Sequence, residues 1–312
     1  MRRIFCNLSL FIATALLLHS GMAVGKDIDW VSLNPELKGA TFVNDSGKCM
    51  ECHEEYIRTF AMTKMGRNLP NGGCESCHGP MSKHIDAPRQ EPPIVVSFTK
   101  KNGHLTPAQK SSVCTQCHQD GIQMNWATSA HANAENTCTT CHNIMAVDDP
   151  VLTKTTQPQV CFQCHQDKRA KMNRVSRHPV REGKVVCSDC HNPHGGPGPM
   201  QLAKNTINEV CYQCHADKRG PFLWEHEPVR ENCTLCHDPH GSTQPRMLKV
   251  RMPFLCQECH QLGGGHPSQL YDGSAVAPPG SNRSRYVLAN SCANCHPQVH
   301  GSNHPSGVRF QR

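Results

Sequence analysis

Residues 178–195 read H-P-V-R-E-G-K-V-V-C-S-D-C-H-N-P-H-G and contain the pattern C-x-x-C-H at Cys187, Cys190 and His191. This pattern is the attachment signature of a c-type haem, in which the two thiols add to the vinyl groups of the porphyrin. The adjacent histidine then becomes the proximal ligand of the iron, and a second histidine on either side of the motif makes the iron six-coordinate. Residues 226–241 repeat the same pattern.

The chain holds ten such motifs, and they use twenty of its twenty-one cysteines; the exception is Cys6. The predicted attachment cysteines are Cys49, Cys52, Cys74, Cys77, Cys114, Cys117, Cys138, Cys141, Cys161, Cys164, Cys187, Cys190, Cys211, Cys214, Cys233, Cys236, Cys256, Cys259, Cys292 and Cys295. The predicted proximal ligands are His53, His78, His118, His142, His165, His191, His215, His237, His260 and His296. We therefore predict ten covalent haem c groups. Zinc sites and a disulfide scaffold are the alternatives, but neither requires a histidine after the second cysteine in all ten motifs.

The composition is too polar to build a large side-chain core. Aromatic residues make up 5% of the chain, and glycine and proline contribute 23 residues each; the mean hydropathy is −0.54. Ten porphyrins would supply the missing apolar surface, so the protein without haem is expected to be largely unfolded. The predicted fold is mostly α-helical and irregular, an elongated array of two-haem repeats wrapped around ten covalent haems with little β-sheet.

The motifs divide into five two-haem units, whose first motifs begin near residues 49, 114, 161, 211 and 256. The similar spacing of the middle units is the signature of a quasi-linear array rather than a globule. Two irregular inserts interrupt the rhythm, Ile85–Ser112 and Leu262–Ser291. Each is interpreted either as a docking end or as a surface excursion without a special role.

Residues 1–23 are predicted to be a signal peptide, with Arg2 and Arg3 before an apolar run at Leu8–Leu18 and small residues at the cleavage site. The run is far shorter than the ~20 residues that span a bilayer. Residues 24–312 then form the exported decahaem domain, in the periplasm. The formal net charge of +7 is outweighed by about −20 from the haem propionates, offset by about +10 from ferric irons. The basic sequence is thus no argument for binding nucleic acid.

The predicted mature chain holds ten further histidines, which matches the number of predicted haems. These candidate distal ligands are His84, His104, His131, His178, His194, His226, His240, His266, His300 and His304. The match favours bis-histidine ligation at nearly every iron. The sequence alone does not assign each histidine to an iron, because a distal histidine can reach the haem of another motif.

Unit one departs from this pattern. In units two to four a histidine stands seven to nine residues ahead of the second motif, whereas the stretch before Cys74 contains Met65 instead. Met65 is either a distal ligand of the first haem, which would raise its potential, or a packing methionine. If Met65 is a ligand, one of His300 and His304 is spare. Two Asp-Lys-Arg triplets, 167–169 and 217–219, either steer a partner or, as we favour, pair with propionates or with solvent.

The ten motifs after a leader, the run C-E-S-C-H-G-P at residues 74–80 and the tail H-G-S-N-H-P-S-G at residues 300–307 resemble the periplasmic decahaem cytochromes of the MtrA/PioA/DmsE type. The resemblance covers essentially the whole predicted mature chain. It implies a string of closely spaced bis-histidine haems inserted into an outer-membrane β-barrel porin. The implied partners are a periplasmic or inner-membrane cytochrome donor and an extracellular multihaem cytochrome, mineral or terminal reductase. By this resemblance the Cys49 haem lies at the periplasmic end and the Cys292 haem at the far end.

Three functions are compatible with this chemistry. The favoured one is a transmembrane electron wire, which is a carrier and not an enzyme, associated with the outer membrane. The second is a soluble periplasmic shuttle that feeds a reductase. The third is a multihaem reductase of a small oxyanion, which requires an iron with an open position; no motif here ends in lysine instead of histidine. The sequence contains no catalytic triad, acid–base pair or phosphate loop.

Overall fold

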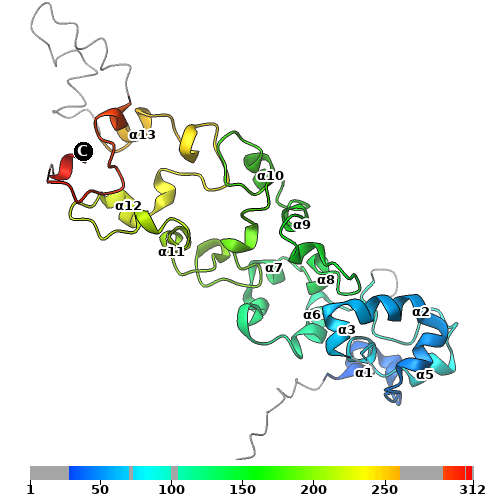
Figure 1. Cartoon of the computed structure of the whole chain (residues 1–312). Coiled ribbons are helices and arrows are strands. Elements are labelled where there is room, and N and C mark those ends of the chain that lie inside the picture. The colour runs from blue at the N-terminus through cyan, green and yellow to red at the C-terminus, as the bar shows by residue number, and fades with distance from the viewer. Residues whose placement is uncertain (1–27, 70–72, 100–104, 261–290, 306, 311–312) are drawn as a thin grey trace, which may run out of the picture.

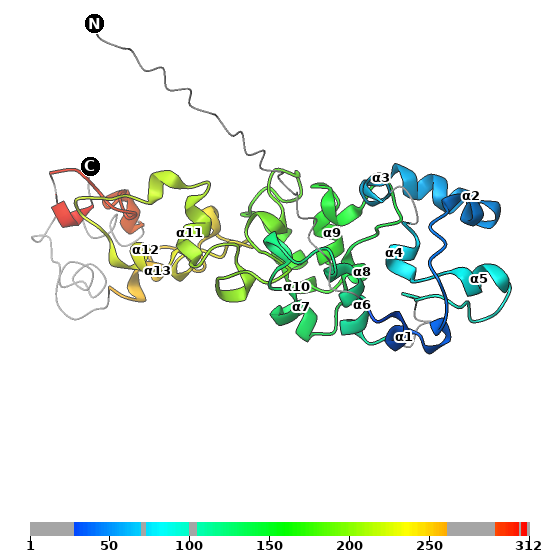
Figure 2. The same ribbon diagram turned by 90° about the horizontal axis from the view of Figure 1, so that it is seen from below.

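The computed structural model describes residues 28–69, 73–99, 105–260, 291–305 and 307–310. The predicted signal peptide and nearly all of the Leu262–Ser291 insert lie outside these ranges. Figure 1 shows an elongated molecule whose colour runs from blue at one end to red at the other, so units that are consecutive in the sequence are neighbours in space. Figure 2 shows the same progression from a second direction.

Short helices are the regular elements of the described part of the chain. The α-helices are α1 (Trp30–Leu33), α2 (Ser46–Met62), α3 (Lys64–Asn68), α4 (Glu75–His78), α5 (Ser82–Asp86), α6 (Pro107–Thr115), α7 (Ala130–Asn133), α8 (Cys138–Cys141), α9 (Gln157–Cys161), α10 (Gln166–Met172), α11 (Ile207–Tyr212), α12 (Glu227–Glu231) and α13 (Phe254–Gln257). The 3₁₀ helices are η1 (Pro35–Leu37), η2 (Gly121–Gln123), η3 (Trp126–Thr128), η4 (Pro150–Leu152), η5 (Cys187–Asp189), η6 (Pro199–Gln201), η7 (Ala216–Lys218), η8 (Cys233–Leu235), η9 (Pro245–Met247), η10 (Cys292–Asn294) and η11 (Gly307–Arg309). Extended segments pair at four isolated bridges. The predicted fold class, mostly α-helical and irregular, is confirmed.

Local sequence signals explain where several of these helices start. Thr106 and Thr206 each form a capping box with the residue three positions later, at the start of α6 and α11. The longest helix, α2, is kinked at His53, whose backbone angles are not helical. Among the described residues, no helix is long and apolar enough to cross a membrane.

The N-terminal end contains a small side-chain core. Leu37, Ile94, Val96 and Val113 form a buried cluster in which each residue is at most 9% exposed. Two of these residues come from the Ile85–Ser112 insert, so the part of that insert that the structure describes is not simply a surface excursion. It packs against unit one and closes the core.

A buried carboxylate holds the same region together. Glu75, inside the C-E-S-C-H motif, is 2% exposed. Its two oxygens accept hydrogen bonds from the backbone N–H groups of Val43, Asn44 and Met81, at 2.8–3.1 Å. These bonds tie the segment before α2 to the segment that follows the second motif.

The remaining units enclose space instead of a side-chain core. A continuous cavity of about 3660 Å³ runs from Ile28 to Phe310, and every motif cysteine and motif histidine of units two to five lines it. A pocket for one small ligand usually measures about 300–1,000 Å³, so this cavity is several times larger than a single site. The residues that the sequence assigns to haem therefore face one shared interior.

Candidate haem sites

Each C-x-x-C-H motif forms a single helical turn. In nine motifs the backbone N–H of the histidine donates to the carbonyl of the first cysteine, at 2.9–3.1 Å; the tenth, at Cys49, lies within α2. Residues three and four apart share one face of a helical turn. The turn therefore places both thiols and the imidazole on the same side, as covalent attachment and proximal ligation require.

Within each unit, the first cysteines of the two motifs adjoin. A side-chain hydrogen bond joins the thiols of the pairs Cys49–Cys74, Cys114–Cys138, Cys161–Cys187, Cys211–Cys233 and Cys256–Cys292. In the unattached thiol form, the hydrogen bond from Cys114 lowers the pKa of Cys138 to about 6. The bond from Cys211 likewise lowers the pKa of Cys233 to about 7. The two attachment points of every unit are thus neighbours.

Between units, the second motif of one unit adjoins the first motif of the next. Burial and then the charge of a cysteine in the next unit raise the pKa of Cys77 and of Cys236; the respective neighbours are Cys117 and Cys259. Electrostatic interactions also join Cys141 to Cys161 and Cys164, and Cys190 to Cys214. Together with the contacts inside the units, these interactions connect all ten motifs in sequence order.

Seven of the ten predicted proximal histidines face a candidate distal histidine. The ring centroids are 6.0–6.3 Å apart in the pairs His53–His84, His165–His131, His142–His194, His215–His178, His191–His240, His260–His226 and His237–His300. Each pair joins one predicted proximal ligand to one predicted distal ligand. Six of the pairs bring together residues of consecutive units, which the sequence did not reveal.

This separation fits a metal ion held between two imidazoles. With a metal–nitrogen bond of about 2.0 Å, and the ring centre about 1.1 Å beyond the nitrogen, two coordinating rings lie roughly 6 Å apart. Five of the seven pairs are close to parallel, with interplanar angles of 12–21°. The chain thus presents the donor set of bis-histidine haem iron at these motifs.

The second-motif histidines are oriented by their other ring nitrogen. The Nδ1 atoms of His78, His191 and His237 lie 2.8–3.0 Å from the carbonyls of Val96, Met200 and Arg246. His296 contacts the Arg309 carbonyl in the same way. A ring that donates its Nδ1 proton presents Nε2 to a metal. Sequence reasoning missed these acceptors, because a carbonyl has no residue-type signature.

His142 is the exception in this series. Its Nδ1 lies 2.8 Å from the Oδ2 atom of Asp149, a carboxylate whose side chain is 11% exposed. Asp149 also accepts from the backbone N–H groups of Asn143 and Val151. A carboxylate behind a ligating histidine raises the basicity of the imidazole, so the Cys138 motif has a proximal ligand unlike the others.

Three of the distal histidines are held by the neighbouring unit. The Nδ1 atoms of His131, His178 and His226 lie 2.8–2.9 Å from the carbonyls of Pro193, Pro239 and Val299. Each carbonyl immediately precedes another distal candidate, namely His194, His240 and His300. The two distal ligands of each interlocked pair are therefore positioned together.

Burial keeps the distal imidazoles in the form that binds metal. It lowers the pKa of His84, His194, His240 and His300, and charges from nearby histidines lower the pKa further. Because a metal competes with the proton for the ring nitrogen, a lowered pKa favours the neutral ligand.

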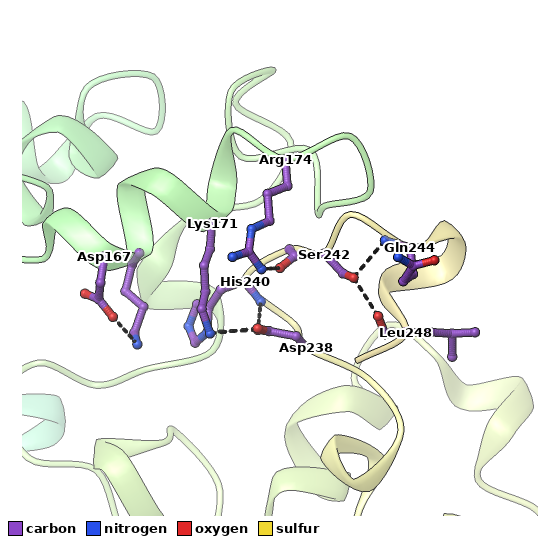
Figure 3. A network of polar contacts seen from close by, with 10 residues as sticks. Asp167, Lys171, Arg174, Asp238, His240, Ser242, Gln244 and Leu248 are labelled. Carbon is purple, nitrogen blue, oxygen red and sulfur yellow. Dashed lines mark hydrogen bonds and ion pairs between the residues drawn. The ribbon is translucent and has the colours of Figure 1, made fainter. Parts of the chain in front are cut away.

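Polar contacts between units hold His240 in place, as Figure 3 shows. Lys171 of α10 donates to Asp238 at 2.7 Å, and Arg174 donates to the Gly241 carbonyl at 3.2 Å (Figure 3). Asp238 in turn accepts from the His240 backbone N–H.

The two Asp-Lys-Arg triplets form exposed pairs within themselves. Asp167 pairs with Lys168, and Asp217 pairs with Lys218. Lys168 and Lys218 also line the cavity.

At the first motif, His84 is the residue whose ring faces His53. Met65 is one of the residues that line the shared cavity. His300 faces His237 and is not spare, while His304 is exposed on the C-terminal loop. His104 and His266 lie outside the described residues.

The zinc and disulfide alternatives find no support in the described ranges. These ranges contain no group of three or more histidine, cysteine, aspartate or glutamate side chains placed to hold a metal ion. None of the twenty motif cysteines is paired in a disulfide.

Comparison with known proteins agrees with this geometry. The family model for a doubled CXXCH motif matches residues 131–170, 178–220 and 226–263, and the cytochrome c3 model matches residues 42–126. The chain is 44% identical over 272 residues to the multiheme cytochrome MtrA of Shewanella baltica (strain OS185), which covers 85% of this chain and 80% of the relative. The chain therefore belongs to the MtrA family of multihaem c-type cytochromes: it binds covalent haem c and carries electrons, and it is not an enzyme.

Proposed function

We propose that the protein is a decahaem wire that carries electrons across the outer membrane. The observation that supports this most strongly is the unbroken series of contacts between consecutive motifs. Thiol contacts alternate between first cysteines within a unit and second cysteines between units, as at Cys114–Cys138 and Cys77–Cys117. Because electron transfer weakens steeply with distance, a wire requires that no two consecutive carriers be separated.

The ten motif histidines would hold the irons from one side, and the seven histidines that face them would supply the second ligand. A bound haem would supply an iron that alternates between ferric and ferrous states. The second-motif histidines, together with His131, His178 and His226, are held in one orientation because each Nδ1 atom has a hydrogen-bond partner. Coordination that does not change on reduction suits a carrier rather than a site that binds substrate.

The elongated shape suits a path from one side of a membrane to the other (Figures 1 and 2). We infer that the Cys49 end lies in the periplasm, next to a periplasmic or inner-membrane cytochrome donor. The Cys292 end would then face an extracellular multihaem cytochrome, a mineral or a terminal reductase. Irregular backbone carries unpaired polar groups that cannot face lipid, so an outer-membrane β-barrel porin would have to surround the chain.

Transfer across a sealed membrane tests this proposal. Liposomes would hold a redox dye inside and the protein with its co-purified barrel in the bilayer, and a membrane-impermeant reductant would be added outside. We expect rapid reduction of the dye with both components and none with the barrel alone. If the native protein instead fractionates free of any barrel and the liposomes stay oxidised, the chain is a soluble periplasmic shuttle.

A further inference from the structure

The distal histidines follow one rule along the array. A histidine ahead of the second motif of a unit faces the first motif of the next unit, as in His131–His165, His178–His215 and His226–His260. A histidine shortly after a second motif faces the second motif of the preceding unit, as in His194–His142, His240–His191 and His300–His237. Applied to units one and two, the same rule predicts the ligands of the irons at His118 and His78.

At the first of these positions the chain has Met65. It stands nine residues before Cys74, as His178 stands nine residues before Cys187. The backbone is also equivalent to that around His131. Met65 is the second residue of α3, whose cap Thr63 accepts from the N–H of Gly66; His131 is the second residue of α7, whose cap Ser129 accepts from the N–H of Ala132.

Burial and position agree with this equivalence. Thr63 and Ser129 are both 3% exposed, so the two caps are anchored to the same degree. Met65 is half-buried and, like Cys117 and His118, lines the shared cavity.

At the second position the chain has Met145, three residues after His142. Its side chain is 40% exposed and is not part of the cavity lining, so its assignment is carried by the backbone turn. Met145 occupies the third place of a turn that the distal histidines of the later units share. In unit two the N–H of Ala146 donates to the Asn143 carbonyl at 3.1 Å. The matching bonds, at 3.0 Å, join Gly195 to Asn192, Gly241 to Asp238 and Gly301 to Gln298, and their third places hold His194, His240 and His300.

Positions 65 and 145 both hold methionine where the later units hold histidine. The contact between the two ligands of a pair gives a reason for this. In the later units the first ligand of each pair donates its Nδ1 proton to the carbonyl just before the second ligand. A methionine has no such proton, and the corresponding carbonyl belongs to Ile144. With methionine at 65 this bond between the two turns cannot form, and the turn at Met145 is closed by its own backbone bond. The flexible side chain of methionine can adapt to such a site.

We propose that Met65 is the distal ligand of the haem iron at His118, and Met145 that of the haem iron at His78. This inference rests on the proposed haem array and deepens it. Replacement of an axial histidine by methionine raises the reduction potential of a c-type haem. The second and third carriers, which are consecutive, would then hold electrons more strongly than their bis-histidine neighbours. They would form a step of higher potential close to the Cys49 end.

Near-infrared magnetic circular dichroism of the fully oxidised holoprotein tests the ligands directly, because histidine/methionine, bis-histidine and high-spin haems give separate bands. We expect a band for two histidine/methionine haems in the unchanged protein. Met65→Leu and Met145→Leu should each remove half of that band, and the double variant all of it. Met124→Leu, at a methionine that is 68% exposed and that the spacing rule assigns to no iron, should leave the band unchanged.

Conservative replacement gives a second readout. Met65→His and Met145→His should convert the lost band into bis-histidine signal and shift the highest potentials of a redox titration downward. A spectrum without any histidine/methionine component, or a band that survives in the double leucine variant, would overturn the proposal. So would a new high-spin haem in His104→Ala, because it would give His104 the place assigned to Met145. The spectrum does not depend on a membrane, so failure of the liposome experiment would leave this assignment standing.

Discussion

The N-terminal unit and the later units solve the same folding problem in different ways. Residues 28–118 hold a cluster of buried side chains around Leu37 and Val96 and a buried carboxylate, Glu75, satisfied by backbone N–H groups. In the later units that the structure describes, buried apolar residues such as Val186 and Leu248 belong to no such cluster, and the motif residues line a shared cavity.

The difference shows what a haem does for a polar chain. Where an insert brings Ile94 and Val96, the polypeptide packs against itself. Where the repeat contains only motifs and short links, the apolar surface must come from the cofactor. We therefore expect haem attachment to be a folding requirement mainly for units two to five, and the N-terminal end to retain structure of its own.

The largest effect is expected when haem attachment is prevented. In protein made without the attachment machinery, residues 131–260 should lose nearly all the protection against backbone hydrogen exchange that the holoprotein has. Without haem, no porphyrin supplies the apolar surface that these residues pack against. The segment around Leu37, Val96 and Val113 should keep measurable protection. Peptide-resolved hydrogen exchange by mass spectrometry measures both. Equal loss of protection throughout the chain would show that the N-terminal core does not fold alone.

Removal of the buried carboxylate should weaken the N-terminal unit alone. Glu75→Ala leaves three buried backbone donors without an acceptor, at a cost of about 3 kcal/mol or more in the free energy of unfolding. Denaturant unfolding followed by exchange at residues 43–44 measures it. Glu51→Ala is the control, since Glu51 lies inside the other motif of the same unit and is exposed. A comparable loss in the control would contradict the assigned role of burial.

The carboxylate behind His142 should tune one haem without unfolding its unit. In Asp149→Asn the imidazole keeps a hydrogen-bond partner but loses the adjacent negative charge, which stabilises the ferric state. The ferric state of that haem should lose about 1 kcal/mol of stabilisation, which raises the midpoint potential by on the order of 40 mV for one electron. Spectroelectrochemical titration gives the shift. Asp148→Asn, at the exposed neighbouring residue, should move no component.

The smallest effect is expected at the contact between units three and four. Lys171→Met removes the partly buried ion pair with Asp238 and should lower the free energy of unfolding by about 1 kcal/mol. Faster exchange near His240 should accompany it. Lys168→Met breaks an exposed pair with its neighbour Asp167 and no contact between Lys171 and Asp238, so it should change stability little. If both variants behave alike, the contact in Figure 3 does not hold the units together.

Much of the site follows from the sequence because the chemistry of attachment is local. Two thiols and an imidazole within five residues, as at Cys187–His191, need only one helical turn to face the same way. The scarcity of apolar residues likewise predicts a helical and irregular chain without a conventional core. The role of the Ile85–Ser112 insert was not predicted, because the packing of Ile94 and Val96 depends on partners far away in the sequence.

The sequence by itself determined which residues attach haem and which histidines are available as ligands, because these properties depend on residue type and short spacing. Only the tertiary structure decided which distal residue faces which motif. A pair such as His142 and His194 is separated by a whole unit, and its meeting depends on how consecutive units interlock. The same long-range geometry places His84, and not Met65, opposite His53, since ligation is set by position in space.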